Sequence, residues 1–187
     1  MAAGRTSQPE AVTGVLLVGG ASRRFGAPKA LAPLHGRTLA AHAWAALEWC
    51  DERIAVGKLA DALPLPFPLT DDDSELRAPL AGLVAGLRTA THDLCVVLAV
   101  DFPLVTPELL RSLAAACSDA AAAVPQTGPL PGAYRRSSLP VFEERLASGD
   151  LSIRGALRKL RTATTNCDPK LLVNVNTEAE LRAIGPP

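Results

Sequence analysis

The sequence has no excess of charge of either sign, because 19 Lys and Arg residues balance 19 Asp and Glu residues. Proteins that bind along a nucleic-acid backbone need clustered cations in excess, so the charge balance argues against that class. No apolar run reaches the roughly 18–20 residues of a membrane-spanning helix, and residues 1–10 lack the apolar stretch of a signal peptide. We expect a cytoplasmic protein that has neither nucleic acid nor a membrane as a partner.

Cysteine is scarce and scattered, with four residues in the whole chain. The cysteines form no C-x-x-C pair and have no histidine cluster beside them, which argues against a zinc site. A disulfide framework is typical of much shorter secreted chains. We expect four reduced, mostly buried thiols, at Cys50, Cys95, Cys117 and Cys167.

What the sequence does have is a hydrophobic content of 48% over 187 residues, which suits one compact α/β domain. We expect a disordered tail over residues 1–11 and a single domain over residues 12–187. Short β-branched runs predict strands, and Ala/Leu-rich segments that open with Thr or Pro predict helices. The predicted strands are 12–18, 53–56, 94–100, 120–124 and 172–175, and the predicted helices are 38–49, 79–89, 106–117, 139–147, 152–160 and 177–183.

The alternation of strands and helices indicates βαβ units and a mainly parallel sheet. The run at residues 94–100 is apolar at every position, as in the centre of such a sheet. Residues 63–73 hold three prolines and three aspartates and predict an irregular loop with room for a short strand. Residues 129–134 predict an edge segment. The expected fold is a three-layer α/β/α sandwich with a mostly parallel, Rossmann-like sheet.

A glycine-rich loop follows the first predicted strand, at the end of the sheet where open α/β folds bind ligands. Glycines let backbone N–H groups approach a phosphate, and Arg24 and Lys29 add positive charge that suits a triphosphate. The loop fits neither the P-loop nor the dinucleotide pattern. A flexible turn with solvated arginines is the alternative. The full string is Leu17-Val18-Gly19-Gly20-Ala21-Ser22-Arg23-Arg24-Phe25-Gly26-Ala27-Pro28-Lys29.

Asp101 follows the strongest strand and begins the tripeptide Asp101-Phe102-Pro103. A carboxylate in this place is expected at the ligand-binding rim of the sheet. Mg²⁺ takes few protein carboxylates and completes its octahedron with phosphate oxygens and water, so one aspartate can hold it. The alternative is an aspartate that only caps the turn before the next helix. We predict Asp101 as the ligand of a Mg²⁺ cofactor.

The loop resembles the L-x-G-G-x-S-x-R-M-G-x-x-K signature of MobA-like nucleotidyltransferases, with Phe25 in place of the methionine. The resemblance implies a sheet of the nucleotide-diphospho-sugar transferase type. It implies catalytic roles for Arg24, Lys29 and the metal aspartate Asp101. The nucleotide-binding residues that it implies in this part of the chain are Leu17, Val18, Gly19, Gly20, Ser22, Arg24, Lys29 and Asp101.

The segment from Asp71 to Gly82 resembles the family's D…G-P-L-A-G segment, with Ala78 in place of its first glycine. The resemblance implies a guanine-nucleotide pocket, and Asp72 is the nearest rival to Asp71. The family's asparagine-containing segment after the second strand is replaced here by Ala-Val-Gly-Lys at residues 55–58. Lys58 is either a surface lysine or a contact to phosphate or pterin. The residues carried over are Asp71, Pro79, Leu80 and Gly82.

Two later segments extend the resemblance to the acceptor side. Residues 174–178 resemble the start of the family's N-x-N-T-P-E-E-L, and residues 129–137 resemble its P-L-x-x-x-Y-x-x-S. The resemblance implies that Asn174, Asn176 and Arg135 bind the acceptor. The alternatives are that Asn176 or Thr177 simply caps the last helix and that Arg135 is an exposed arginine.

The resemblance implies that the protein transfers GMP from GTP to the phosphate of molybdopterin or molybdenum cofactor and releases pyrophosphate. It also implies transient contact with molybdoenzymes or other cofactor-synthesis proteins. Two alternatives stay open within the transferases, a cytidylyltransferase for the same pterin and an enzyme for another phosphorylated small molecule. A nucleotide-binding protein without turnover is the third.

Overall fold

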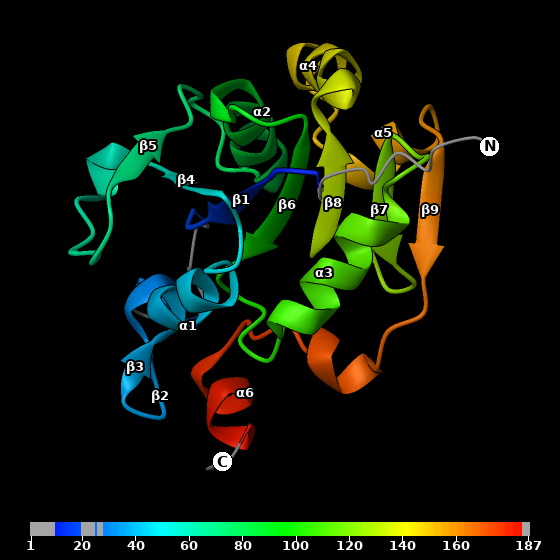
Figure 1. The fold of residues 1–187 in the computed structure, drawn as a ribbon. Coiled ribbons are helices and arrows are strands. Elements are labelled where there is room, and N and C mark those ends of the chain that lie inside the picture. Colours follow the sequence, from blue (N-terminus) through cyan, green and yellow to red (C-terminus); the bar gives the residue numbers. More distant parts are fainter. Residues whose placement is uncertain (1–9, 20–24, 26–27, 185–187) are drawn as a thin grey trace.

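A seven-stranded sheet runs through the centre of the computed structural model, which describes residues 10–19, 25 and 28–184 (Figure 1). The strand order is β5-β4-β1-β6-β8-β7-β9, and a two-stranded hairpin of β2 and β3 lies outside this sheet. The strands are β1 (Val12–Leu17), β2 (Pro33–Leu34), β3 (Arg37–Thr38), β4 (Glu52–Gly57), β5 (Leu69–Asp71), β6 (Leu94–Ala99), β7 (Ala122–Pro125), β8 (Gly132–Arg135) and β9 (Thr162–Thr165).

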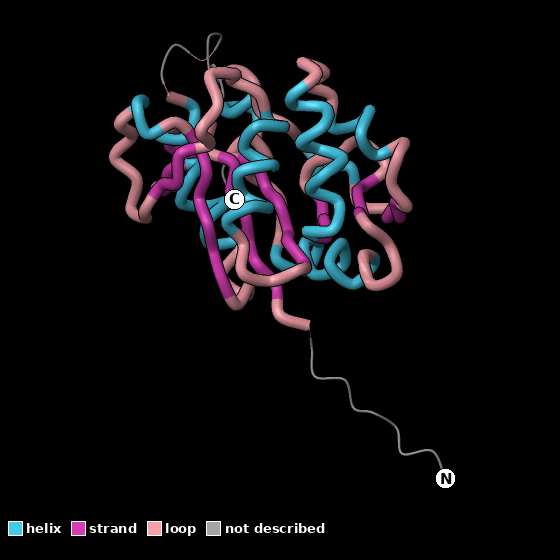
Figure 2. The backbone as a smooth tube through the Cα atoms, turned by 90° about the horizontal axis from the view of Figure 1, so that it is seen from above, coloured by secondary structure: helices cyan, strands magenta, loops and turns pink. Residues whose placement is uncertain are grey.

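Helices cover both faces of the sheet, as Figure 2 shows from above. Helices α1 (Leu39–Ala46) and α3 (Pro107–Ala116) pack in one apolar cluster, and α2 (Pro79–Thr89), α4 (Leu139–Ala147) and α5 (Ile153–Leu157) pack in another. Helix α6 (Glu178–Ala183) packs against the β2–β3 hairpin in a third, smaller cluster. The expected three-layer sandwich is confirmed. The 3-10 helices are η1 (Lys29–Leu31), η2 (Leu59–Asp61), η3 (Arg136–Ser138) and η4 (Pro169–Leu172).

The central strand β6 is apolar on both sides because each face meets a different helical layer. Leu94, Val96 and Leu98 belong to the cluster with α1 and α3, whereas Cys95 and Val97 belong to the cluster with α2, α4 and α5. This alternation follows the two-residue period of a strand. Strand β6 pairs in parallel with β1, which itself pairs in parallel with β4. The carboxyl ends of these three strands therefore meet along one edge of the sheet.

Helix α2 lies very close to the sheet at Gly86. A Cβ atom added there would come within 2.4 Å of the Cγ1 atom of Val15, and real side chains do not approach so closely. The bare glycine thus lets the helix backbone settle onto β1. The same helix carries Ala78, Pro79 and Gly82 at the sheet edge where β1 and β6 end, so its packing fixes part of the pocket described below.

Two strand predictions were wrong, and three strands were missed, namely β9 and the two short strands of the β2–β3 hairpin. Strand β8 is not at an edge, because it pairs antiparallel with β6 on one side and with β7 on the other. Pro129 and Pro131 precede the strand and remove no donor from its ladder. Residues 172–175 form no strand: Leu172 ends η4, and the next residues have no regular secondary structure. The edge strand on this side of the sheet is β9, a run of Thr and Ala that pairs with β7.

All four cysteines are free; Cys95 and Cys117 are buried, and Cys50 and Cys167 are half-buried. Burial raises the pKa of the Cys95 thiol to about 12.

Glu10, which we assigned to the tail, pairs with Arg135 at 2.5 Å, so the end of that segment contacts the domain. Among the helices that the structure describes, none is long and apolar enough to span a membrane.

Candidate functional site

The carboxyl ends of β1, β4 and β6 open into a pocket of about 740 Å³. This volume lies within the range of roughly 300–1,000 Å³ that is usual for ligand pockets. Its position is the one that open α/β sheets use for ligand binding. The residues that line it are Leu17, Val18, Gly19, Lys29, Val56, Gly57, Lys58, Asp72, Arg77, Ala78, Pro79, Gly82, Ala99, Val100, Asp101, Phe102, Thr127, Gly128, Pro129, Leu130, Leu172, Asn174 and Asn176.

The start of the glycine-rich loop forms one wall of the pocket. Leu17, Val18 and Gly19 line it, as predicted from the sequence. The backbone N–H of Val18 donates to the carbonyl of Val56 at 2.8 Å, which ties this wall to the end of β4. The predicted binding residues Gly20, Ser22 and Arg24 lie outside the described residues.

Lys29, Asp101 and Asn176 meet in the pocket although they are far apart in the sequence. The ammonium of Lys29 lies 3.8 Å from Oδ2 of Asp101 and donates to the side-chain oxygen of Asn176 at 3.3 Å. The side chain of Lys29 is 13% exposed and that of Asp101 is 25% exposed. The structure thus brings together one predicted residue from each of three separate motifs. A cation and a carboxylate held side by side can bind phosphate and a metal ion respectively.

The second carboxylate oxygen of Asp101 has no hydrogen-bond partner among the described residues. Oδ1 is buried and accepts no hydrogen bond from any residue that the structure describes. Burial raises the pKa of the Asp101 carboxyl, and the nearby charge of Lys29 and the Asn174 amide oppose that rise. An unpaired buried acceptor is costly in a folded protein, which suggests that a ligand completes this group. The backbone carbonyl of Asp101 also accepts from Val175 N at 2.8 Å, which anchors the C-terminal segment here.

The acidic loop contributes Asp72 to the pocket, and not Asp71. The Asp71 carboxylate accepts from the backbone N–H groups of Leu59 and Asp73, at 2.8 and 2.9 Å, and these bonds stabilise the loop itself. Asp72 lines the pocket, and its side chain is 7% exposed. The residue that we ranked second from the sequence is therefore the one in position. The length of the loop decides between the two, because a shift of one residue in the loop would exchange the positions of the Asp71 and Asp72 side chains.

The N-terminus of helix α2 faces the same pocket. Pro79 and Gly82 line it, whereas Leu80 is fully buried in the core beneath and does not. The residue before the helix, Ala78, has no side chain that can cap the first turn. The N–H groups of that turn give this part of the pocket a positive potential.

The C-terminal segment closes one side of the pocket with Asn174 and Asn176. Thr177 caps α6, since its hydroxyl accepts from Glu180 N at 3.2 Å and the Glu180 carboxylate accepts from Thr177 N at 3.0 Å. Because Thr177 makes the helix cap, the side chain of Asn176 is available to accept a hydrogen bond from Lys29. Of the two caps that the sequence offered, Thr177 is confirmed and Asn176 is wrong.

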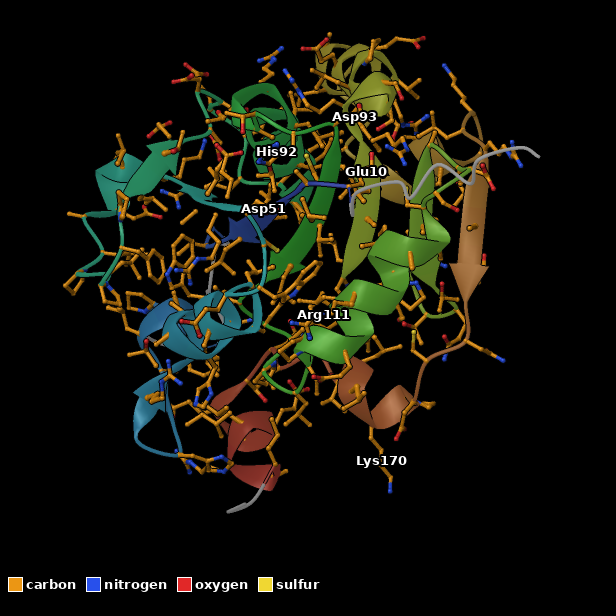
Figure 3. All side chains as sticks on the ribbon, viewed as in Figure 1. Glu10, Asp51, His92, Asp93, Arg111 and Lys170 are labelled. Atoms are coloured by element: carbon orange, nitrogen blue, oxygen red, sulfur yellow. The ribbon has the colours of Figure 1, made fainter. Side chains whose placement is uncertain are left out.

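Arg135 does not reach the pocket. It pairs with Leu94 across the sheet, at the start of β6 and so at the opposite end from Asp101. Its guanidinium donates to Glu10 at 2.5 Å and to Asp93 at 2.8 Å, and these two carboxylates raise its pKa. Figure 3 labels both partners at that end of the sheet. The prediction that Arg135 binds the acceptor is not supported by this position, because an antiparallel strand carries its last residue away from the pocket.

Sequence reasoning missed several residues that line the far side of the pocket. Arg77 stands before helix α2 and is held by Asp61 through two hydrogen bonds of 2.9 and 2.7 Å. Residues 127–130 and Leu172 also line the pocket. The resemblance on the acceptor side covered Pro129 and Leu130, but no sequence pattern marked Thr127, Gly128 or Leu172.

A pocket at the carboxyl ends of parallel central strands, with a glycine-rich loop on one wall, defines a nucleotide-binding α/β protein. Residues 14–165 match the model of the MobA-like NTP transferase domain. The chain belongs to this family of nucleotidyltransferases.

Relatives of known name agree with this assignment. The chain is 32% identical to the molybdenum cofactor guanylyltransferase of Desulfosudis oleivorans over 92% of this chain and 93% of that protein. It is 34% identical to a probable molybdenum cofactor guanylyltransferase of Deinococcus radiodurans over 91% of this chain and 92% of that protein. The crystal structure of molybdopterin-guanine dinucleotide biosynthesis protein A from Archaeoglobus fulgidus matches with a TM-score of 0.77 at 26% identity, over 91% of this chain and 95% of that one. The resemblance and the fold type read from the sequence are confirmed.

Proposed function

We propose that this protein transfers GMP from GTP to the phosphate of molybdopterin or of molybdenum cofactor and releases pyrophosphate. The names of its relatives support this reaction, and each relative aligns over nearly the whole of both chains. The observation that carries the proposal is the meeting of Lys29, Asp101 and Asn176 inside the pocket at the end of β1 and β6.

The reaction needs no nucleophile from the protein. An oxygen of the acceptor phosphate attacks the α-phosphorus of GTP, a new P–O bond forms, and the bond to the pyrophosphate oxygen breaks. The protein then has to position two anionic substrates and compensate their charge. Lys29 and Arg24 bind the triphosphate in this proposal, and Asn174 lies on the acceptor side.

Asp101 is the residue that we propose to hold Mg²⁺. The fit rests on its chemistry: a carboxylate with one buried oxygen that lacks a partner among the described residues suits a hard cation. Those residues contain no cluster of three or more His, Cys, Asp or Glu that could hold a metal by themselves. The remaining ligands would come from phosphate oxygens and water, as is usual for Mg²⁺. When bound, the ion would supply charge compensation at the phosphates.

We propose that Asp72 selects the base. Guanine presents the N1–H and the exocyclic amine on one edge, whereas cytosine and adenine do not present two adjacent donors there. A buried carboxylate that meets the wrong base stays unpaired, which costs about 1–3 kcal/mol, or roughly 5- to 150-fold in affinity. GTP should therefore be preferred over CTP and ATP.

Pyrophosphate release tests this function. Purified protein with Mg²⁺ should release pyrophosphate only when GTP and molybdopterin, or its molybdenum form, are present together. Release with CTP and the same acceptor would instead identify a cytidylyltransferase. Release with GTP and a different phosphorylated acceptor would keep the chemistry and change the substrate. Binding of nucleotide without release across these acceptors would indicate a nucleotide-binding protein without turnover. After synthesis, we expect transient contact with the molybdoenzymes that receive the product.

A further inference from the structure

A largely buried ion pair lies at the carboxyl ends of two neighbouring parallel strands. Lys58 follows β4 and Asp72 follows β5, and Gly57 pairs with Asp71 in the ladder just before them. The ammonium of Lys58 lies 2.5 Å from Oδ1 of Asp72, and the two side chains are only 11% and 7% exposed. Both residues line the pocket. The pair is therefore part of the pocket wall and not a pair on the outer surface.

The contacts of this pair fix the orientation of the carboxylate. Oδ1 of Asp72 accepts from Lys58 and from the backbone N–H of Ser74 at 3.0 Å. Lys58 also donates to the carbonyl of Ser74, so the lysine bridges both ends of the turn that carries Asp72. Both bonds are made to one carboxylate oxygen, and Oδ2 has no hydrogen-bond partner among the described residues. One oxygen is anchored, and the other is left for a ligand in the pocket.

The positive charge of Lys58 compensates the negative charge of Asp72 at this place in the pocket wall. A largely buried carboxylate without a cation is costly. Lys29 partly compensates Asp101 in the same pocket, so it is not the partner that Asp72 needs. With Lys58 in place, Asp72 keeps its strength as a hydrogen-bond acceptor while the pair carries no net charge.

We propose that Lys58 is a positioning residue that sets the base preference of this enzyme through Asp72, without itself touching the nucleotide. The inference rests on the proposed function. Lys58 holds Oδ1 so that Oδ2 faces the guanine edge, where it accepts from the N1–H and the exocyclic amine. Hypoxanthine lacks that amine, so ITP should bind less tightly than GTP. Lys58 is then required for the difference between GTP and ITP, and not for binding of the triphosphate.

Competition titrations with the full chain and Mg²⁺ test this role, with GTP, ITP, 2′-deoxy-GTP and CTP as ligands. We expect the wild type to bind GTP about 10-fold more tightly than ITP, the effect of one hydrogen bond to a charged acceptor. Lys58→Met should reduce that ratio to within about twofold and leave the affinity for ITP nearly unchanged. Lys58→Arg, which keeps the charge, should retain most of the ratio. Lys159→Met is the matched control, because it breaks a 3.0 Å ion pair with Glu144 whose lysine is 50% exposed.

Each other outcome overturns the inference. Equal losses for GTP and ITP in Lys58→Met would mean that Lys58 binds phosphate or only supports the fold. A change confined to the ratio of GTP to 2′-deoxy-GTP would mean that Asp72 reads the ribose. If Lys58→Met does not fold, loss of the GTP/ITP ratio in the folded Lys58→Arg would refute the role of charge. Tighter binding of CTP than of GTP by the wild type would contradict the proposed function as well. Failure of the Lys58 role alone would leave the preference of the wild type for GTP over CTP intact, so the two failures are distinguishable.

Discussion

Replacing Asp101 with asparagine should have opposite effects on turnover and on stability. The carboxylate has a buried oxygen without a partner among the described residues, and burial raises its pKa. A group whose folded pKa is raised contributes stability below its ordinary pKa and loses it as the pH rises through the folded pKa. At neutral and higher pH, the charged Asp101 therefore lowers the stability of the metal-free protein. Asparagine removes that charge.

The magnitudes follow from the same contacts. Asparagine keeps a polar atom in the buried position and removes only the charge. The extra cost of a desolvated charged acceptor is about 1–3 kcal/mol, and the lower end applies because a quarter of the Asp101 side chain is exposed. Lys29 keeps its hydrogen bond to Asn176 at 3.3 Å in the variant. The metal-free variant should gain about 1 kcal/mol at pH 8, or roughly 2–4 °C in Tm for a chain of this size. Loss of the metal ligand should remove about 3–4 kcal/mol of transition-state stabilisation, roughly 150- to 1,000-fold in rate.

Thermal unfolding with and without Mg²⁺, together with pyrophosphate release, measures both effects. The gain in Tm for Asp101→Asn should shrink as the pH falls from about 8 toward 4, because Asp101 then becomes protonated in the wild type. Mg²⁺ with GTP should raise the Tm of the wild type more than that of the variant. Near-normal turnover in Asp101→Asn would refute the metal assignment. A lower Tm than the wild type at pH 8 would refute the account of the unpaired oxygen.

Three further results are expected. Lys29→Ala and Arg24→Ala should each weaken binding of GTP by roughly 10- to 150-fold, because a hydrogen bond to a charged group contributes about 1.5–3 kcal/mol. Binding of GMP should weaken less. Equal losses for both ligands in titrations would show that these cations do not bind the β- and γ-phosphates. Gly86→Ala should lower the free energy of unfolding by about 1–3 kcal/mol in urea titrations, since its new Cβ would lie 2.4 Å from Val15; an unchanged midpoint would show that α2 can shift. Arg135→Ala should leave turnover unchanged and cost about 1–2 kcal/mol of stability through its lost ion pairs; a selective rise in KM for the acceptor would restore Arg135 to the site.

The parts of the fold that were predictable have strong local signals. Helix α2 begins with Pro79, and β6 is apolar throughout, so both were recognised within one residue. Strand β9 was missed because its four residues, Thr-Ala-Thr-Thr, include no fully buried side chain at this edge of the sheet. The position of β8 between β6 and β7 depends on pairing between distant segments, which no local pattern encodes.

The residues of the candidate site also divide into those that a local sequence pattern predicts and those whose place depends on distant contacts. The glycine-rich loop and the aspartate after β6 were found because a ligand at the sheet edge requires residues of those types in those places. The choice between Asp71 and Asp72 depends on hydrogen bonds within one turn, and the structure places Asp72, the rival, in the pocket lining. Arg135 was misplaced because the direction of its strand was unknown. Lys58 was left as either a surface lysine or a contact to phosphate or pterin, because its ion-pair partner Asp72 lies 14 residues away in the sequence.

Mass spectrometry of the reaction product tests the central claim most directly. The protein would be incubated with Mg²⁺, molybdopterin or its molybdenum form, and GTP, CTP and ATP in separate reactions. The account predicts a product from GTP whose mass equals the acceptor plus GMP less water, and little or none from the other two nucleotides. A product that carries CMP, or no nucleotide adduct of this acceptor under any condition, would contradict it.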